Sequence, residues 1–251
     1  MISLEGEAAL ITGGNRGIGR AAALLLAEAG ADIALTCHTR ADEAAATGRE
    51  VEALGRRALI ESGDLADAGV VDRLFDRIAA AFGRLDIFVA NAGIWPADDV
   101  SLGDMSPDRW RRTMAANLDS VFLTTRAALR LMAPGGRIVL VSSTAGQRGE
   151  AGHADYAASK GALIALTKSL AIESAPGVRV NCVAPGWVDT EMCAPVFSQD
   201  SERERIRRTI PLLRIPPPAD IAGPILFLCS ALARHVTGEV LNVNGGSVLC
   251  G

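Results

Sequence analysis

Short apolar runs alternate with longer stretches of helical pattern along this chain. Residues 8–12 (AALIT) are almost entirely apolar, which is typical of a strand buried on both faces of a parallel sheet. Similar strands are expected at residues 32–36, 58–62, 87–90, 137–141, 178–183 and 240–243. Strands that alternate with helices predict one doubly wound α/β domain over residues 1–251, with about seven parallel strands and helices on both faces.

The intervals between these runs carry helical patterns, expected at residues 20–29, 41–54, 67–82, 107–132, 155–174 and 220–229. Asn117 lies inside the long helix, where asparagine is a poor helix former. It is either an exposed residue or the mark of a kink with a freed backbone carbonyl and an ordered water. Residues 191–211 are polar and weakly patterned, so we expect a mobile segment of about 190–215 that covers the substrate.

A glycine-rich loop (GGNRGIG) separates the first strand from the first helix. Glycines let the backbone approach a pyrophosphate, and a helix N-terminus supplies free N–H groups and a positive dipole. The loop therefore predicts a dinucleotide site, and the alternative is a tight turn without a ligand. The expected contacts from the loop are Gly13, Asn15, Arg16, Gly17, Ile18 and Gly19.

The end of the second predicted strand bears on the choice between NADP(H) and NAD(H). An acidic residue near this point reads the ribose 2′-hydroxyl of NAD, but no carboxylate follows the strand before Asp42. Arg16, His38 and Arg40 are instead candidates for holding a 2′-phosphate. We expect NADP(H) to be preferred, with NAD(H) still possible; the alternative is that both arginines are solvated surface charges.

Ligands of doubly wound sheets lie at the carboxyl ends of the strands. Further cofactor contacts are therefore expected where the later strands end, at Asp64, Leu65, Asn91, Ala92, Gly93, Pro185 and Gly186. Asp64 has a second interpretation, as the cap of the next helix.

Candidate chemistry is concentrated around Tyr156, the only tyrosine of the chain, and Lys160, one of two lysines. Residues four apart share a helix face, and a neighbouring ammonium lowers the pKa of a phenol from about 10 toward neutrality. Such a tyrosine can act as a general acid or base. Ser143, thirteen residues earlier, offers a hydroxyl for a substrate carbonyl. The alternative for the Tyr–Lys pair is an ordinary amphipathic helix surface.

Composition narrows the class of protein. The chain has 251 residues, is 49% hydrophobic and carries a net charge of −4 without blocks of like charge. We therefore expect a soluble protein with neither a nucleic-acid surface nor a membrane anchor or span, and with no signal peptide. The cysteines have no metal-ligand spacing with the histidines and are expected to be reduced thiols in a cytoplasmic protein; they are Cys37, Cys182, Cys193, Cys229 and Cys250.

Taken together, the motifs resemble the short-chain dehydrogenase/reductase family over about residues 4–246. The matching stretches are TGGNRGIG (12–19), GDL (63–65), NAG (91–93), AANLDSVF (115–122), Ser143, YAASK (156–160) and PGWVDT (185–190). The family's usual asparagine before NAG is Ala90 here. The resemblance implies a Rossmann-type NAD(P)-dependent oxidoreductase of alcohols and carbonyls, often a homotetramer.

The resemblance also implies roles for individual residues. Tyr156 would be the acid in reduction, and Lys160 would lower its pKa and hold the nicotinamide ribose. Ser143 would orient the substrate oxygen, and Asn117 would hold a water in a proton relay. The contacts implied elsewhere on the cofactor are Val188 and Thr190 at the nicotinamide carboxamide, and Asn91 and Asp64 on the adenosine side.

Within the family, the stretches GEAGHADYAASKGAL and EVLNVNGG look most like 3-oxoacyl-(acyl-carrier-protein) reductases. An acidic acyl carrier requires a basic surface, for which the candidates are Arg203, Arg205, Arg207, Arg208 and Arg214. The alternative for these arginines is a solvated helix with Glu202 and Glu204. Two other functions stay open: a sugar, polyol or steroid dehydrogenase working oxidatively, and a nucleotide-binding regulatory module. Substrate selection is expected from Trp95, Gln147, Arg148, His153 and Trp187.

Overall fold

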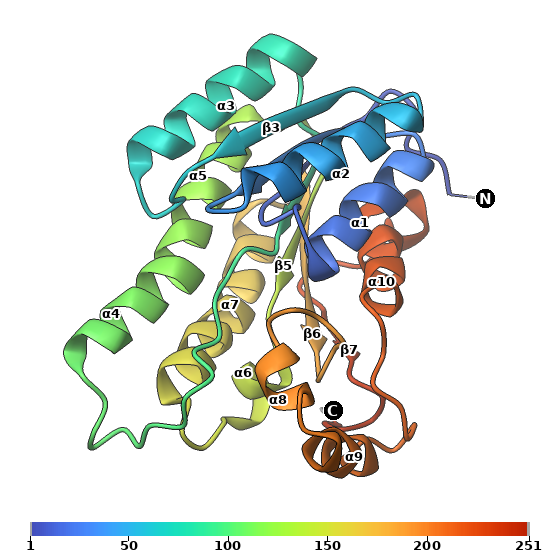
Figure 1. Cartoon of the computed structure of the whole chain (residues 1–251). Helices are drawn as coiled ribbons and strands as arrows, with labels where there is room; N and C mark the ends of the chain where they lie inside the picture. Colours follow the sequence, from blue (N-terminus) through green and yellow to red (C-terminus); the bar gives the residue numbers. More distant parts are fainter. Residues whose placement is uncertain (1, 250–251) are drawn as a thin grey trace.

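The computed structural model describes residues 2–249, which form one parallel seven-stranded sheet in the order β3-β2-β1-β4-β5-β6-β7 (Figure 1). The predicted fold class is confirmed. The strands are β1 (Ala8–Ile11), β2 (Asp32–Cys37), β3 (Ala58–Ser62), β4 (Ile87–Ala90), β5 (Gly136–Val141), β6 (Val178–Pro185) and β7 (Val240–Val243).

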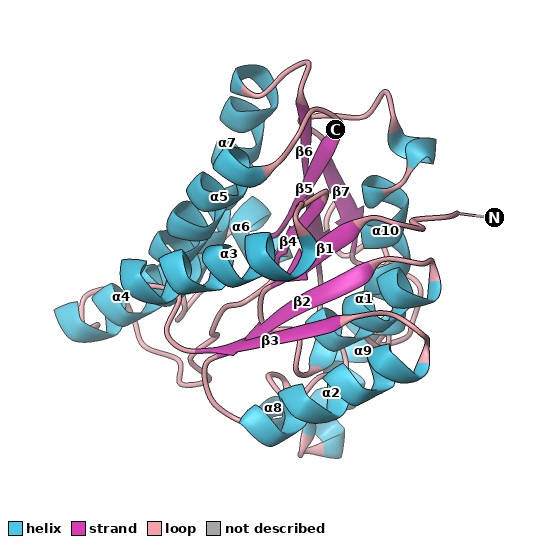
Figure 2. Cartoon of the chain, turned by 90° about the horizontal axis from the view of Figure 1, so that it is seen from above, coloured by secondary structure: helices cyan, strands magenta, loops and turns pink. Residues whose placement is uncertain are grey.

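Helices cover both faces of the sheet, as the view in Figure 2 shows. One buried cluster joins the sheet to three helices: α1 (Gly17–Glu28), α2 (Ala41–Ala53) and α10 (Ala219–Cys229). A second cluster joins the opposite face to α3 (Ala68–Phe82), α5 (Ser120–Leu131) and α7 (Ala154–Glu173). Because apolar helices lie on both sides, central strands such as β1 and β4 are buried along their whole length.

The strand order reverses beside β1, and this reversal positions the ligand site. β1 pairs with β2 on one side and with β4 on the other, so the helices that follow β1 and β4 pass to opposite faces of the sheet. A crevice opens at the carboxyl ends of two strands that diverge in this way. The loops after β1 and β4 are the glycine-rich loop and the NAG segment.

The long helix expected at 107–132 is interrupted. It begins as α4 (Pro107–Met114), capped by Ser106, whose hydroxyl accepts a hydrogen bond from the Arg109 N–H at 3.2 Å. A five-residue π-helix, Ala115–Asp119, then precedes α5. Asn117 lies in this π-helix and is fully buried, so the exposed alternative is wrong and the local irregularity is confirmed. π-Helical turns within α-helices are frequent at functional sites.

Residues 191–211, expected to form a mobile segment over the substrate, contain two short helices, α8 (Ala194–Phe197) and α9 (Asp200–Thr209). They lie beyond the ends of β6 and β7 in Figure 1. Their buried residues Phe197, Ile206 and Ile210 form a small separate core, against which Trp187 packs. The pattern was weak because so few apolar residues anchor this segment among arginines and glutamates.

Three further expectations concern the chain as a whole. None of the helices within residues 2–249 is long and apolar enough to cross a bilayer. The described residues also hold no group of three or more histidine, cysteine or acidic side chains arranged for a metal ion. Cys37, Cys182, Cys193 and Cys229 are free thiols, whereas Cys250 lies outside the described residues.

Candidate active site

The hydroxyl groups of Ser143 and Tyr156 meet at one cavity. Ser143 follows β5 and caps α6 (Thr144–Arg148), where its Oγ accepts a hydrogen bond from the Ala145 N–H at 3.1 Å. Tyr156 lies in the first turn of α7, and its side chain lines the same cavity as that of Ser143. The strand end and the helix cap therefore present both hydroxyl groups to one cavity, as a carbonyl-binding pair requires.

Lys160 lies one helical turn beyond Tyr156, with its Nζ 5.9 Å from the centre of the tyrosine ring. Its ammonium is buried and donates a hydrogen bond to the Val141 carbonyl oxygen at 2.9 Å. Burial lowers the pKa of Lys160 to about 8, because the charged form loses its hydration. The lysine thus faces the same site as the tyrosine, as the four-residue spacing predicts.

The pKa of Tyr156 differs from the expectation of a lowered value. Burial raises the pKa, the neighbouring Ser143 hydroxyl lowers it, and the Glu150 carboxylate raises it again, with a net increase above the ordinary value. Desolvation outweighs the effect of Lys160, because the Lys160 ammonium is directed at the Val141 carbonyl and does not contact the phenol oxygen. The tyrosine is consequently protonated at neutral pH, the form a proton donor needs.

Asn117 ties the π-helix to the segment after β4. Its Oδ1 accepts a hydrogen bond from the Ile94 N–H at 2.7 Å, and its Nδ2 donates to the Ile94 carbonyl oxygen at 2.9 Å and to the Ser159 hydroxyl at 3.1 Å. Gly93 passes so close that an added Cβ would lie 3.0 Å from the Asn117 Oδ1 and 3.3 Å from the Lys160 Nζ. Only glycine fits here without displacing both side chains. A role for Asn117 in proton transfer stays a prediction.

A second cleft adjoins the catalytic cavity at the glycine-rich loop. Arg16 precedes α1 without a side-chain cap, so the first N–H groups of this helix face the cleft. A Cβ added to Gly19 would lie 2.2 Å from the Gly13 carbonyl oxygen, so this turn requires glycine. The Asn91 amide supports the turn by donating to the carbonyl oxygens of Thr12 at 3.0 Å and Gly13 at 3.3 Å.

Most residues expected to contact the cofactor line these two hollows. The cleft is lined by Gly13, Asn15, Arg16, Gly17, Ile18, His38, Asp64, Leu65, Asn91, Ala92, Gly93 and Thr190. The catalytic cavity is lined by Ser143, Tyr156, Lys160, Pro185, Gly186 and Val188. The two hollows adjoin, because they share the lining residues Ile18, Asn91, Gly93, Ile94, Thr190 and Met192.

Arg40 and Gly19 are the exceptions. Gly19 is buried beneath the loop. Arg40 is exposed, and its Nη1 forms an ion pair with the Glu43 carboxylate at 2.8 Å; it is not part of the cleft wall. The structure thus leaves Arg16 and His38, of the three candidates for a 2′-phosphate, beside the cleft.

Other cavity residues were not singled out by the sequence. They are Glu150, Met192 and Cys193. Glu150 comes from the loop between α6 and α7, whereas Met192 and Cys193 come from the segment before α8. Their only sequence signal was closeness to Tyr156 or to the expected lid. Of the residues expected to select the substrate, Trp95, Arg148 and Trp187 also line this cavity.

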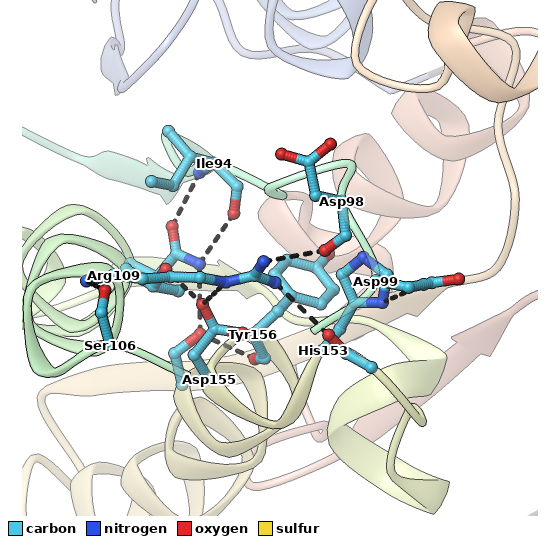
Figure 3. Close-up of polar contacts among 12 residues, drawn as sticks. Ile94, Asp98, Asp99, Ser106, Arg109, His153, Asp155 and Tyr156 are labelled. Atoms are coloured by element: carbon cyan, nitrogen blue, oxygen red, sulfur yellow. Dashed lines mark hydrogen bonds and ion pairs between the residues drawn. The ribbon is translucent and has the colours of Figure 1, made fainter. Parts of the chain in front are cut away.

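A buried polar network adjoins Tyr156 (Figure 3). Arg109 donates from its Nε to the Asp155 carboxylate at 3.2 Å, and from its Nη groups to the backbone carbonyls of Asp98 at 2.8 Å and Gly152 at 3.3 Å. The Thr113 hydroxyl donates to the same Asp155 oxygen at 2.7 Å. One guanidinium thus joins α4, the start of α7 and both loops that flank the cavity.

Comparison with known proteins identifies the class and then the family. Solved structures that resemble this one are Rossmann-type dehydrogenases. One of them is a short-chain dehydrogenase from Burkholderia cenocepacia in complex with NADP. It superimposes with a TM-score of 0.90 and is 40% identical in sequence, covering 97% of this chain and 98% of its own. Residues 13–247 match the family described as Enoyl-(Acyl carrier protein) reductase. The chain therefore belongs to the short-chain dehydrogenase/reductase family, oxidoreductases of alcohols and carbonyls that use a nicotinamide cofactor.

Relatives of two kinds are about equally similar. The 3-oxoacyl-(acyl-carrier-protein) reductase FabG of Aquifex aeolicus is 40% identical over 98% of both chains. The L-rhamnose 1-dehydrogenase (NAD(P)(+)) of a Sphingomonas species is 38% identical over 97% of this chain and 96% of its own. Identity alone therefore does not select between an acyl substrate and a sugar.

Proposed function

We propose that this protein interconverts a ketone and a secondary alcohol with NADP(H), with Tyr156 as the general acid of carbonyl reduction. The observation that carries the proposal is the pairing of Ser143 and Tyr156 in one cavity that shares wall residues with the glycine-lined cleft. A carbonyl oxygen placed at this pair accepts hydrogen bonds from both hydroxyls. Those bonds strengthen as negative charge develops on the oxygen.

The residues present fit a dinucleotide. The turn at Gly13 and Gly19 leaves no room for side chains, and the uncapped start of α1 offers N–H donors to a pyrophosphate. Bound nicotinamide supplies or accepts the hydride. This division leaves to the protein the binding, the orientation and the movement of one proton.

The proton is handled by buried side chains. The raised pKa of Tyr156 keeps the phenol protonated at neutral pH, so it can donate to a developing alkoxide. Ser143 orients the substrate oxygen. Lys160, with a pKa near 8, supplies an ammonium that stabilises the resulting phenolate, and Asn117 is the proposed anchor of the water that returns the proton.

A preference for NADP(H) is supported by the cleft wall. Arg16 and His38 line it, and no carboxylate occupies the end of β2 where a 2′-hydroxyl of NAD would be read. The Burkholderia relative of 40% identity was solved with NADP. Expectations of a homotetramer and a cytoplasmic location stay predictions.

The 3-oxoacyl group is the first substrate to test, since several relatives reduce it by name. The basic surface expected to dock an acidic carrier protein is, however, partly neutralised. Each arginine proposed for that surface is already paired with a carboxylate, in the pairs Arg203–Asp189, Arg205–Glu202, Arg207–Glu204, Arg208–Glu204 and Arg214–Asp220. A sugar or polyol is the second candidate, favoured by the Glu150 carboxylate in the catalytic cavity.

The test follows the loss of NADPH and, separately, NADH absorbance with acetoacetyl thioester or a small ketone. We expect turnover with NADPH to exceed turnover with NADH. The Tyr156→Phe variant should lose roughly 10²–10⁴-fold in kcat. Cofactor binding should still quench the tryptophan fluorescence of this variant. Unchanged turnover in this variant would remove Tyr156 from the chemistry, and a lost cofactor signal would indicate misfolding instead.

A further inference from the structure

Glu150 has no role in the mechanism above, yet its side chain lies at the catalytic cavity. It stands in the loop between α6 and α7 and lines the cavity together with Ser143 and Tyr156. Its side chain is only 21% exposed. The carboxylate is close enough to Tyr156 to raise the pKa of the phenol. A negative charge therefore faces the volume that the substrate must occupy.

Aromatic side chains build the wall around this carboxylate. Trp95 lines the cavity beside Glu150 and lowers the pKa of its carboxyl group, and the Trp95 ring meets that of Trp187 edge to face, with the centres 5.8 Å apart and the planes at 84°. Trp187 in turn contacts Phe197 of α8 with ring centres 5.8 Å apart. Helix α8 therefore supports Trp187 directly, and Trp95 through Trp187.

His153 supports the same wall from behind. Its ring stacks on Trp95 with the centres 4.7 Å apart and the planes at 17°, and its Nδ1 lies 3.9 Å from the Glu150 Oε1 and 3.4 Å from the Asp99 Oδ1 (Figure 3 shows His153 and Asp99). The histidine side chain is 3% exposed, and its Nε2 has no hydrogen-bond partner among the described residues. Buried and stacked, this ring fixes Trp95 and with it the position of the carboxylate.

The chemistry of the wall selects between substrate classes. The carbonyl of a 3-oxoacyl thioester is surrounded by methylene groups and acceptor oxygens, which donate no hydrogen bonds. Such a substrate would leave the partly buried Glu150 carboxylate without the hydrogen-bond donors that it has in water. Burial already raises the pKa of Glu150, which reflects that loss of hydration. A substrate with hydroxyl groups beside the reacting carbon restores the missing hydrogen bonds.

An ammonium-bearing substrate would also meet the carboxylate, but two neighbours oppose it. Arg148 lines the same cavity and acts on Glu150 as a positive charge, and a protonated His153 would do so from behind. Their charges offset that of Glu150, so a second cation gains little there. A neutral ligand that both donates to a carboxylate and accepts from a guanidinium fits the pair of opposite charges.

We propose that Glu150, Arg148 and Trp95 form a subsite for a polyhydroxylated substrate, a sugar or an alditol, whose hydroxyl next to the reacting carbon donates to the Glu150 carboxylate. This inference rests on the proposed function, since it places the reacting carbon at the Ser143–Tyr156 pair. It makes Glu150 a specificity-determining residue. A site that hydrogen-bonds a substrate hydroxyl strongly rejects an analogue without that hydroxyl. An apolar pocket discriminates much less against an analogue that carries an additional hydroxyl.

The experiment compares kcat/KM for matched six-carbon pairs: fructose against 2-hexanone with NADPH, and glucitol against 2-hexanol with NADP. Acetoacetyl thioester and an amino ketone complete the panel. Glu150→Gln and Glu150→Leu are measured beside Glu52→Gln, an exposed carboxylate on the outer surface of α2. Quenching of tryptophan fluorescence by the alditol gives a binding constant that does not depend on turnover, because Trp95 and Trp187 form the subsite wall.

We expect the wild-type protein to prefer a hydroxylated substrate by at least about 100-fold, less than the roughly 10⁴–10⁵-fold of a fully enclosed hydrogen-bonding site. Glu150→Gln should weaken kcat/KM and binding of that substrate by roughly 10–100-fold, the range for a hydrogen bond to a charged group, and Glu150→Leu should weaken it further. Turnover of the simple ketone should fall clearly less than that of the hydroxylated substrate in both variants, because the ketone has no hydroxyl to donate to Glu150, and Glu52→Gln should change neither.

Three results would overturn the subsite. The first is a preference for 2-hexanone or the thioester, the second is equal losses for hydroxylated and simple substrates in Glu150→Gln, and the third is a preference for the amino ketone. Each leaves the proposed function standing, because turnover still occurs. Failure of wild-type protein to turn over any member of the panel while it binds NADPH would count against the proposed function itself, and the subsite would fall with it.

Discussion

Arg109 and Asp155 form a buried ion pair directly behind Tyr156, with side chains 9% and 0% exposed. Asp155 precedes the tyrosine in sequence, so the pair fixes the helical turn that carries the proton donor (Figure 3). Burial by itself raises the pKa of Asp155, but the hydrogen bonds from Thr113 and Arg109 outweigh it and hold that pKa below its usual value. The carboxylate therefore stays ionised in the folded protein.

Breaking this pair should cost stability. Asp155→Asn leaves the Arg109 guanidinium buried without its counter-charge, and we expect the free energy of unfolding to fall by about 3–5 kcal/mol, the usual range for one lost partner of a buried pair. Chemical denaturation at neutral pH measures the loss. The matched control is Asp108→Asn, which removes a 93%-exposed partner of Arg111 and should leave stability unchanged. Equal stability in the two variants would contradict a structural role for the buried pair.

The same pair should act on catalysis through position. In Asp155→Asn we expect kcat to fall while the KM for cofactor changes little, because the cleft at the glycine-rich loop does not contact this network. A loss of cofactor affinity equal to the loss of kcat would indicate a general loosening of the fold instead. Asp155 is in this sense a positioning residue that acts through Tyr156.

Tyr156 offers a direct spectroscopic prediction, because it is the only tyrosine of the chain. The phenolate absorbance near 295 nm should therefore report this residue alone. We expect the cofactor-free protein to titrate above the ordinary value of about 10, since burial disfavours the charged phenolate. Denaturant should return the titration to about 10. A folded-state midpoint below 10 would mean that Lys160 dominates over burial, as the sequence alone suggested.

The pKa of Tyr156 is a property that the sequence does not determine locally. The strands, the glycine-rich loop and the Tyr–Lys spacing were predictable because each depends on residues adjacent in sequence or one helical turn apart. The direction of the Tyr156 pKa shift was not, because it depends on burial by segments far away in sequence. Glu150 was overlooked for the same reason: a lone carboxylate in a polar loop resembles a solvated residue until Trp95 and His153 close around it.

Two other features have local causes. In the sequence, only Asn117 marked the π-helix at Ala115–Asp119, and the hydrogen bonds of Asn117 to Ile94 show why the extra residue is accommodated. The helix α9 has a single buried residue, Ile206, so its apolar periodicity is too weak to detect. Its arginines looked like a free basic surface because the sequence does not show which carboxylates they meet.

Lys160 should make stability depend on pH. Its pKa of about 8 in the folded protein lies below the ordinary value of about 10.4, so between these values the unfolded chain binds more protons. The contribution of Lys160 to stability should therefore rise with pH in this window, by about 1–2 kcal/mol between pH 8 and about 9.5. The measurement is the difference in stability between wild type and Lys160→Met, in which the opposite contribution of the buried Cys182 and Cys229 thiols cancels, because burial raises their pKa values to about 11 and about 12. Lys168→Met, which removes the other lysine from an exposed position on the same helix, should retain the contribution of Lys160.

The upper limit of that window is set by Tyr156. Above about pH 10 the unfolded phenol ionises before the folded one, which lowers stability and opposes the effect of Lys160. Denaturation series should therefore stop below pH 10. A wild-type stability that falls from pH 8 upward, relative to Lys160→Met, would show that the ammonium is stabilised in the folded state.

Arg16 and Arg40 should differ in their effect on cofactor choice, although the sequence presents them as equivalent. Arg16 lines the cleft, whereas Arg40 is exposed and paired with Glu43. Arg16→Ala should weaken NADPH binding by roughly 10–100-fold, the range for a charge-assisted hydrogen bond, and leave NADH binding within about threefold. Arg40→Ala, measured by the same cofactor fluorescence titration, should have the smaller effect, because its guanidinium already has a counter-ion. A larger loss of NADPH affinity in Arg40→Ala than in Arg16→Ala would place the 2′-phosphate beyond the cleft wall, on the α2 side. Equal losses of NADPH and NADH affinity in Arg16→Ala would show that Arg16 binds the pyrophosphate instead.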